Sequence, residues 1–262
     1  MSAGRTWYHT IDLPDGSSTP GWFDTRQAPS FVPWPAELEG GRCLDVGTFD
    51  GFWAFEMERR GAGEVVAIDV DDPAQLDWPY DRRQWGPDAM REWGSERGPG
   101  FDDAARRLGS AVKRLNRSIY DLDPVVDGTF DVVFCGALLL HLRDPVLGLE
   151  RLRDVCRGSV VLVEAIDPRL DLVARYTPAA RLAPEPDEWW RVNSAGLVRM
   201  ADVAGLGVRR LGRRFVVPLG PGAPAGHRLT ALAGLAALRP GRRGLLTRAL
   251  VAEPRPPSGR RR

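Results

Sequence analysis

Apolar runs and segments of helical spacing alternate through the central part of this chain. The strands predicted from the apolar runs cover residues 43–46, 65–69, 112–115, 130–135 and 160–163. The helices predicted from the spacing of apolar positions cover residues 52–60, 101–108 and 145–155. Strands that alternate with helices favour a parallel sheet covered by helices on both faces. The pattern therefore predicts an α/β fold.

The segment before this pattern, residues 1–40, is rich in aromatic residues but has no long period. Its prolines, from Pro14 to Pro35, leave room for short helical turns only. Because so many aromatic rings are rarely left together in water, we expect either an arm that packs on the core or a lid over a ligand site.

After residue 167 the alternation of strands and helices breaks down. A proline-rich stretch at 168–190 precedes a predicted helix at 194–204 and one or two predicted strands at 208–217. We therefore assign residues 41–220 to the core, with cap insertions. Residues 221–262 form a predicted C-terminal extension, and the composition of its last ten residues predicts disorder.

The stretch from Cys43 to Asp69 contains two apolar runs with a glycine-containing turn and a helix between them. Gly47 and Gly51 bracket the turn, and Asp69 ends the second run. In a parallel sheet, such glycines let a ligand approach the backbone, and the acid accepts hydrogen bonds from ribose hydroxyls. The stretch predicts an enzyme with a nucleoside cofactor.

The residues of the turn distinguish between two kinds of cofactor. Phe49 stands where a dinucleotide motif has its central glycine, and Asp45 and Asp50 place two carboxylates beside the turn. Carboxylates repel a pyrophosphate but suit a cationic ligand that carries an ammonium group. S-adenosylmethionine has both a sulfonium and an ammonium, so the turn favours it over a nicotinamide dinucleotide.

Six strings of sequence, taken in order, resemble one family of class I methyltransferases. They are LDVGTFDG, VAID, RSIYDL, FDVVFCGALLLHLRDP, VLVEAID and WWRVNSAGL. The family is related to the bacterial enzyme that carboxymethylates the wobble uridine of tRNA, and the resemblance extends over residues 8–205. It implies a seven-stranded, Rossmann-like class I methyltransferase sheet that binds an S-adenosylmethionine-type cofactor.

The resemblance also implies which residues surround this cofactor. Gly47 would line the methionine part, Asp69 would accept from the ribose hydroxyls, and Gly136 and Leu140 would flank the sulfonium. The end of the third strand would border the adenine, with Asp121 as a further partner for its amino group. The full set of predicted cofactor-binding residues is Arg26, Asp45, Gly47, Gly51, Asp69, Ser118, Ile119, Tyr120, Gly136 and Leu140.

Two residues near strand tips are candidates for chemistry on the acceptor. His141 follows the fourth strand, and an ordinary imidazole pKa of about 6.5 suits a general base. The alternative for His141 is a structural role in the turn before Pro145. Glu164, at the end of the fifth strand, would orient a hydroxyl or an amine. The aromatic residues that would form cavity walls, with plain packing as the alternative, are Trp22, Phe23, Trp34, Trp189 and Trp190.

The composition of the chain limits which binding partners and which cellular compartment we expect. The 262 residues carry a formal net charge of +1, so no global field favours nucleic acid. Cys43, Cys135 and Cys156 lack the spacing of a zinc site or a disulfide framework. The apolar stretch 229–238 is shorter than the ~20 residues of a membrane helix, and residues 1–40 lack the apolar core of a signal peptide. We therefore expect a cytoplasmic protein without a metal.

One departure from the family bears on the group that is transferred. In the tRNA enzyme, a lysine upstream of the first glycine motif helps to bind an additional carboxylate on the cofactor, whereas the single lysine here is Lys113. We expect Arg26 to pair instead with the amino-acid carboxylate of ordinary S-adenosylmethionine. The predicted function is methyl transfer to an O or N atom of a small molecule. The alternatives are a tRNA wobble-uridine alkyltransferase, a nicotinamide-dependent oxidoreductase and a non-catalytic binding module.

Overall fold

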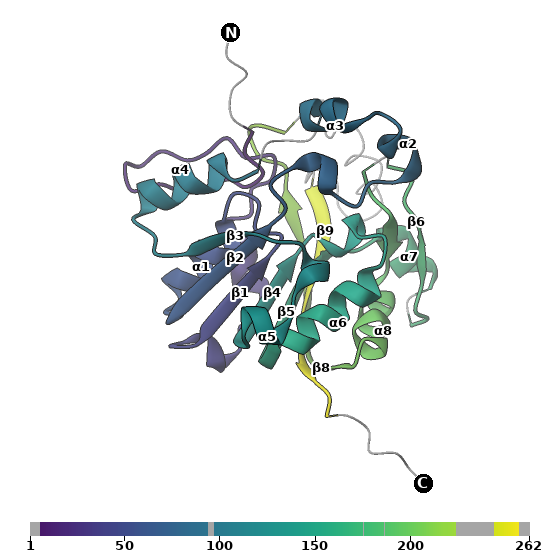
Figure 1. Cartoon of the computed structure of the whole chain (residues 1–262). Coiled ribbons are helices and arrows are strands. Elements are labelled where there is room, and N and C mark those ends of the chain that lie inside the picture. Colours follow the sequence, from purple (N-terminus) through teal and green to yellow (C-terminus); the bar gives the residue numbers. More distant parts are fainter. Residues whose placement is uncertain (1–5, 94–96, 175, 186, 224–243, 257–262) are drawn as a thin grey trace.

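A seven-stranded sheet with the strand order β3-β2-β1-β4-β5-β9-β8 forms the centre of the computed structural model (Figure 1). The structure describes residues 6–93, 97–174, 176–185, 187–223 and 244–256. The strands of the large sheet are β1 (Arg42–Val46), β2 (Glu64–Asp69), β3 (Lys113–Asn116), β4 (Phe130–Gly136), β5 (Cys156–Ala165), β8 (Leu206–Pro218) and β9 (Gly244–Pro254). Strands β6 (Ala180–Leu182) and β7 (Trp190–Val192) pair as a separate antiparallel ribbon.

The first five strands of the large sheet are parallel, as the sequence predicts. Val46, the last residue of β1, lies opposite Ile68 of β2 on one side and Cys135 of β4 on the other. The carboxyl ends of these strands therefore meet at one edge of the sheet, where parallel α/β proteins bind their ligands. Strand β9 is antiparallel to both of its neighbours, β5 and β8. The predicted seven-stranded α/β fold is confirmed.

Helices cover both faces of the sheet (Figure 1). On one face, α1 and α4 contribute Phe52, Met57 and Phe101 to a buried apolar cluster. On the other face, α6 and α8 contribute Leu149 and Leu197 to a second cluster. The helices are α1 (Phe52–Arg59), α2 (Tyr80–Arg83), α3 (Pro87–Trp93), α4 (Pro99–Leu108), α5 (Pro124–Asp127), α6 (Pro145–Val155), α7 (Pro168–Val173) and α8 (Ser194–Val203).

Local sequence sets the starts of helices α6 and α8. Helix α6 begins with Pro145 at its first position, and the Oδ1 atom of Asp144 accepts a 2.9 Å hydrogen bond from the N–H of Leu147. In the same way, Asn193 precedes α8 and accepts a 2.7 Å bond from the N–H of Gly196. These caps fix where the chain leaves the sheet edge and enters each helix.

The N-terminal arm is part of the core. Trp7, Ile11 and Phe23 are buried in the same apolar cluster as α1. The arm also pairs with the sheet, because the N–H of Asp24 donates a 2.8 Å hydrogen bond to the carbonyl oxygen of Pro218 at the end of β8. Of the two predicted possibilities for this segment, the structure favours packing on the core.

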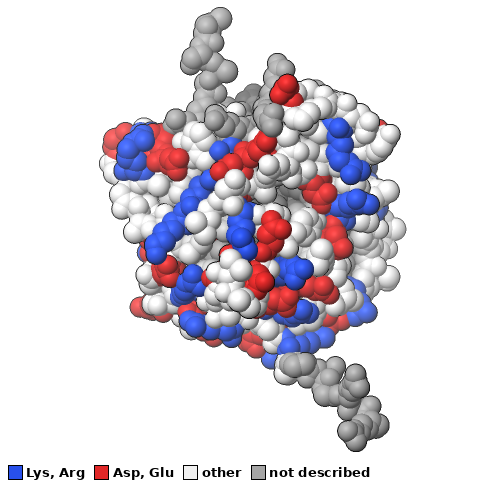
Figure 2. Space-filling model, viewed as in Figure 1, with Lys and Arg blue, Asp and Glu red and all other residues white. Residues whose placement is uncertain are grey.

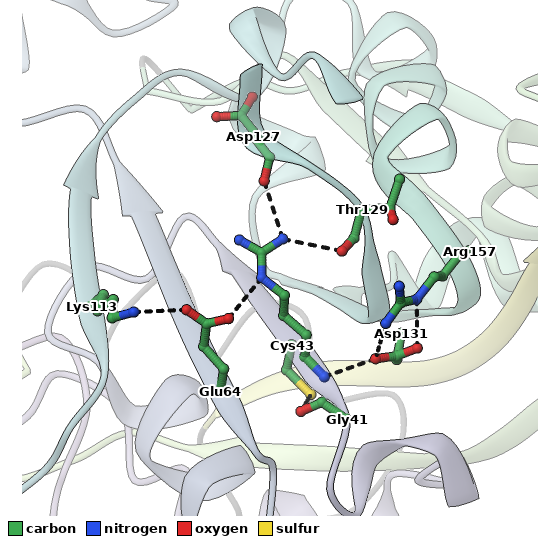
Figure 3. A network of polar contacts seen from close by, with 9 residues as sticks. Gly41, Cys43, Glu64, Lys113, Asp127, Thr129, Asp131 and Arg157 are labelled. Atoms are coloured by element: carbon green, nitrogen blue, oxygen red, sulfur yellow. Dashed lines mark hydrogen bonds and ion pairs between the residues drawn. The ribbon is translucent and has the colours of Figure 1, made fainter. Parts of the chain in front are cut away.

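A polar network holds the strands together at the edge opposite the ligand edge (Figure 3). Glu64 of β2 accepts 2.8 Å bonds from Arg42 of β1 and from Lys113 of β3. Asp131 of β4 binds the guanidinium of Arg157 at 2.7 and 2.8 Å, and this hydrogen bonding lowers the pKa of Asp131 to about 2. The network therefore serves the sheet and lies away from the predicted site.

Two boundaries predicted from the sequence are wrong. Strand β9 falls within the predicted C-terminal extension of residues 221–262, yet it lies between β5 and β8, so the core does not end at residue 220. Strand β9 also extends to Pro254, into the ten residues predicted to be disordered. The apolar stretch 229–238 lies outside the described residues. Within the part of the chain that is described, no helix has the length and apolarity needed to cross a membrane.

Candidate active site

The turn between β1 and α1 lies across the end of β2. The N–H groups of Gly47 and Thr48 donate to the carbonyl oxygen of Ile68 at 2.9 and 3.1 Å. Gly47 has a φ of +77°, and a Cβ atom there would lie 3.1 Å from the Leu138 side chain in the loop after β4. Gly47 therefore permits both the backbone conformation of the turn and the close approach of these two loops.

Gly51 serves the core rather than the ligand edge. It precedes α1 with a φ of +92°, and a Cβ atom there would lie 2.4 Å from the ring of Phe55 and 2.7 Å from that of Phe101. Both rings belong to the buried cluster under α1. The predicted ligand contact at Gly51 is therefore not what constrains this position, and a side chain there would act on folding first.

Asp69, at the tip of β2, connects three parts of the ligand edge. Its Oδ2 atom accepts a 2.7 Å hydrogen bond from the N–H of Phe49, and its Oδ1 atom accepts one of 2.8 Å from Val70. Arg97 also binds Oδ1 at 2.8 Å, and its guanidinium stacks over the ring of Phe49. Because each carboxylate oxygen has two acceptor sites, Oδ1 is saturated and Oδ2 keeps one site for a ribose hydroxyl.

Asp45 is a buried carboxylate with unused hydrogen-bonding capacity. Its Oδ2 atom has no hydrogen-bond partner among the described residues, and its side chain is 2% exposed. Burial raises the pKa of Asp45 to about 7, and the nearby charge of Asp69 adds to this effect. The unpaired Oδ2 acceptor of Asp45, buried just before the turn, fits the ammonium group that the sequence predicts for the ligand.

Asp50 has a different role from the one expected of the Asp45–Asp50 pair. Its Oδ2 atom accepts 2.8 Å hydrogen bonds from the N–H groups of Tyr8 and His9, and its Oδ1 atom pairs with the imidazole of His9. Asp50 is 1% exposed. The carboxylate that was predicted to face a cationic ligand instead fastens the N-terminal arm to the turn.

The segment after β3 lies beside Asp69, as predicted for an adenine border. The N–H of Arg117 donates a 2.9 Å bond to the carbonyl oxygen of Asp69, which places Ser118 next to the tip of β2. Ile119 is buried in the core, whereas the hydroxyl of Tyr120 donates to Asp77 at 2.9 Å. All three predicted border residues have structural partners, because the Ser118 hydroxyl accepts a 3.2 Å bond from the N–H of Tyr120.

The loop after β4 is held in place by Glu164. The Oε1 atom of Glu164 accepts hydrogen bonds of 3.1 and 3.2 Å from the N–H groups of Leu138 and Leu139. Burial raises the pKa of Glu164 to about 8, although these two bonds act in the opposite direction. Glu164 thus positions the loop that contains Leu140, and it borders a cavity of about 10 Å³ with Leu140 and Trp190.

His141 connects the same loop to the cap formed by residues 168–192. Its Nδ1 atom lies 2.7 Å from the carbonyl oxygen of Asp187, so Nδ1 carries the proton and Nε2 is left as an acceptor. Burial lowers the pKa of His141, which keeps the ring neutral. The cap is also bound by its backbone, because the N–H of Trp189 donates a 2.7 Å bond to the carbonyl oxygen of Leu140.

Sequence reasoning missed three residues that the fold brings to this edge, namely Arg97, Tyr8 and Glu188. The ring of Tyr8 packs against Phe49 at a centroid distance of 5.3 Å. Burial raises the pKa of the Tyr8 hydroxyl, and the next largest effects come from the charges of Glu188 and Glu164. Burial also raises the pKa of Glu188 to about 8. Charges on the tip of β5 and on the cap therefore act on the Tyr8 hydroxyl of the arm.

The aromatic residues proposed as cavity walls divide into two groups. Trp34 stacks on Phe134 at 5.8 Å and belongs to the core. Trp22 lies 6.2 Å from Tyr8, which places it beside the ligand edge.

Arg26 forms ion pairs with Asp24 at 2.7 Å and with Asp12 at 3.0 Å, so its guanidinium is engaged within the arm.

Comparison with known proteins agrees with this architecture. Residues 44–163 match the model of a family described as a methyltransferase domain. This match covers the turn, Asp69, the segment after β3 and the loop after β4. The chain carries a class I methyltransferase domain.

The curated relatives of this methyltransferase that we compared are described as tRNA U34 carboxymethyltransferases. The protein from Chromohalobacter salexigens is 27% identical over 185 residues, which cover 70% of this chain and 48% of the relative. The protein from Pseudomonas aeruginosa is 28% identical over 163 residues, which cover 62% and 43%. The methyltransferase thus spans about half the length of the curated relatives it matches.

Solved structures share its fold at low sequence identity. The Burkholderia thailandensis 1,6-didemethyltoxoflavin-N1-methyltransferase with bound S-adenosylhomocysteine is 14% identical, with a TM-score of 0.51, over 88% of this chain and 75% of that chain. An S-adenosylmethionine-dependent methyltransferase from Mesorhizobium loti is 11% identical, also with a TM-score of 0.51, over 86% and 96%. The predictions of a class I methyltransferase and of S-adenosylmethionine as its cofactor are confirmed.

Proposed function

We propose that this methyltransferase acts on an oxygen or nitrogen atom of a small molecule. The observation that supports the proposal is the enclosure of the ligand edge from two sides. The arm is bound to the turn through Asp50, and the cap is bound to the loop after β4 through His141 and Trp189. An edge closed on both sides suits a small acceptor better than a folded polynucleotide.

The residues at this edge can bind, orient and deprotonate such an acceptor. When bound, S-adenosylmethionine supplies a methyl group on a sulfonium. Asp45 and Asp69 are placed to bind the ammonium and ribose groups, and Tyr8, Phe49 and Trp22 exclude water with their rings. Holding the acceptor in line with the methyl donor then provides much of the rate.

His141 is the best placed general base in this proposal. Its Nδ1–H group donates to the carbonyl oxygen of Asp187, which fixes the ring and leaves Nε2 to take the proton of an acceptor hydroxyl or amine. Burial lowers the pKa of His141, so the base is in its active neutral form at neutral pH. Glu164 acts through the loop that it holds, as a positioning residue.

The distribution of charge also supports a small acceptor. Acidic and basic side chains are interspersed over the face shown in Figure 2, and the formal net charge is +1. Proteins that bind tRNA usually gather basic residues on one face, because the phosphates dominate the affinity. The free thiols of Cys43, Cys135 and Cys156 are all buried, which agrees with the cytoplasmic location that we propose.

A second candidate function is alkyl transfer to the wobble uridine of tRNA. The observation that favours it is the similarity to the tRNA U34 carboxymethyltransferases over 70% of this chain. The additional carboxylate of a carboxymethyl donor would need a paired cation at the site. Arg26 already pairs with Asp24 and Asp12, and it would have to leave both to bind any carboxylate of a cofactor.

The partition of a labelled methyl group separates these two functions. The enzyme is incubated with methyl-labelled S-adenosylmethionine together with a small-molecule extract and, separately, with unmodified tRNA. We expect label in the small-molecule fraction, and we expect the His141→Asn variant to lose this transfer while it still binds S-adenosylhomocysteine. Label that enters only the tRNA fraction would favour the second candidate.

A further inference from the structure

A cavity of about 660 Å³ lies between helices α7 and α8 and the strands β8 and β9. These elements lie together at the β9–β8 side of the sheet (Figure 1). Part of the wall is apolar and includes Val198 and Leu211. The charged residues of the wall are four arginines and two aspartates, namely Arg199, Arg214, Arg248, Arg255, Asp171 and Asp202.

The two aspartates neutralise three of the four arginines. Asp202 pairs with both Arg199 and Arg255. Asp171, which is 5% exposed, pairs with Arg214 at 2.7 Å. Asp171 also accepts hydrogen bonds of 2.8 and 3.1 Å from the N–H and the hydroxyl of Ser194. Among the described residues, no further carboxylate lines the cavity.

Arg248 is the guanidinium that remains without a carboxylate. Its Nε atom donates a 3.1 Å hydrogen bond to the carbonyl oxygen of Gly212, and its two terminal nitrogens have no partner among the described residues. Burial lowers the pKa of Arg248, and the neighbouring charge of Arg214 lowers it further. The terminal N–H groups of Arg248 therefore face the cavity with their hydrogen-bonding capacity unused.

The register of the sheet makes this arrangement costly without a counter-ion. Arg248 of β9 lies directly opposite Arg214 of β8, and like charges at directly opposed positions destabilise a sheet. The negative charge of Asp171 also acts on Arg248, but its carboxylate oxygens bind Ser194 and Arg214. An anion in the cavity would remove the repulsion and occupy the free N–H groups of Arg248 at once.

We propose that this cavity binds a phosphate group, carried on a small molecule with an apolar body. A guanidinium offers paired N–H groups that match two oxygens of a tetrahedral oxyanion. The apolar residues Val198 and Leu211 would then contact the body of the ligand. This site is distinct from the methyl-transfer site, because Leu197 and Met200 of α8 face the cavity beside Glu164 while Val198 and Arg199 face this one.

The experiment measures thermal unfolding of the full chain against increasing inorganic phosphate, phenyl phosphate and, for comparison, sodium chloride at equal ionic strength. The variant is Arg248→Gln. The matched control is Arg209→Gln, because Arg209 lies on β8, is exposed and pairs with Glu253 at 2.9 Å outside the cavity. None of these measurements depends on methyl transfer, so they test this site independently of the proposed function.

We expect phosphate to raise the melting temperature of the wild type in a saturable way, and phenyl phosphate to do so at lower concentration. Arg248→Gln should lose at least about tenfold in phosphate affinity, and without phosphate it should melt no lower than the wild type because the repulsion with Arg214 is gone. Arg209→Gln should respond as the wild type does. An equal response in all three proteins, or no saturable response in the wild type, would overturn the proposal. If inorganic phosphate binds as tightly as phenyl phosphate, the site recognises the phosphate group alone. The part of the proposal that gives the ligand an apolar body would then be wrong.

Discussion

Asp50 binds His9 twice, with one carboxylate oxygen 2.8 Å from the backbone nitrogen and the other paired with the imidazole ring. Both residues are buried, at 1% and 5% exposed. They are 41 positions apart in the sequence, so this contact joins the N-terminal arm to the turn that carries Gly47. The Asp50–His9 pair is therefore a direct polar link between the arm and the turn at the ligand edge.

We expect Asp50→Asn to loosen the arm without unfolding the sheet. The amide removes the charge that holds His9 and the N–H of Tyr8, and loss of a buried charge-assisted contact costs on the order of 1.5–3 kcal/mol. Limited proteolysis should then cut within residues 6–34 faster than in the wild type. Asp15→Asn is the control, because Asp15 is an exposed residue of the same arm. Equal cleavage of both variants would show that Asp50 does not hold the arm.

Deletion of the arm would not distinguish a lid from a part of the core. Trp7, Ile11, Leu13 and Phe23 lie in the same buried cluster as Phe134 of β4. Removal of residues 1–30 would expose that cluster, so loss of activity would reflect loss of the fold as much as loss of a lid. Single substitutions at the Asp50 contact avoid this ambiguity.

A second prediction concerns the competition between Arg97 and the cofactor for Asp69. Arg97 binds Oδ1 of Asp69 at 2.8 Å, which leaves one acceptor site on Oδ2 for a ribose hydroxyl. We expect Arg97→Gln to strengthen binding of S-adenosylhomocysteine in calorimetry, and Asp69→Asn to weaken it at least about tenfold. Arg107→Gln, which breaks contacts with Asp15 and Ser17 away from Asp69, should leave the affinity unchanged. Unchanged affinity in Asp69→Asn would remove this residue from the cofactor site.

A third prediction concerns the pH dependence of methyl transfer. His141 must be neutral to accept a proton, and burial lowers its pKa from the ordinary value. The rate should therefore be constant above about pH 6.5 and fall only at lower pH, as the ring becomes protonated. His141→Asn should reduce kcat by about 10²–10⁴-fold and leave the affinity for S-adenosylhomocysteine unchanged. A full rate in this variant would make His141 a structural residue of the turn.

A fourth prediction uses the raised pKa of Glu164. Burial raises the pKa to about 8 in the folded protein, so the folded state binds more protons than the unfolded state between about pH 4.5 and pH 8. Stability from this group is therefore present at low pH and is lost as the pH rises through 8. We expect Glu164→Gln to flatten the fall in the free energy of unfolding across this range. Its amide oxygen still accepts from Leu138 and Leu139, so parallel curves for variant and wild type would contradict the assignment.

The sequence predicts the parts of the fold whose signal is local. The apolar runs and helical spacing between Cys43 and Val163 predict five strands and the helices α1, α4 and α6, because each element carries its own periodicity. Strand β9 escapes this reasoning because its partners β5 and β8 are chosen by the tertiary structure. The sequence of β9, GLLTRALVAEP, contains no local signal for the strands with which it pairs.

Some residues of the candidate site can also be predicted from local sequence, and others cannot. Asp69 and the loop of His141 were predicted because they follow strands directly, and the topology of a parallel sheet brings such residues to one edge. The segments that contribute Tyr8, Arg97 and Glu188 have no regular pattern of apolar positions. The partner of Asp50, His9, lies in the N-terminal arm. Contacts of this kind depend on how the arm and the cap pack, which short motifs do not encode.

The central claim, that the enzyme transfers a methyl group from ordinary S-adenosylmethionine, is tested most directly by mass spectrometry of the cofactor that co-purifies with the protein. Arg26 is engaged by Asp24 and Asp12, and the only lysine, Lys113, binds Glu64 at the opposite edge of the sheet. A donor with an additional carboxylate would leave that charge without an assigned partner. We expect S-adenosylmethionine or S-adenosylhomocysteine, and a carboxylated form of the cofactor would show that the enzyme does not use the ordinary methyl donor.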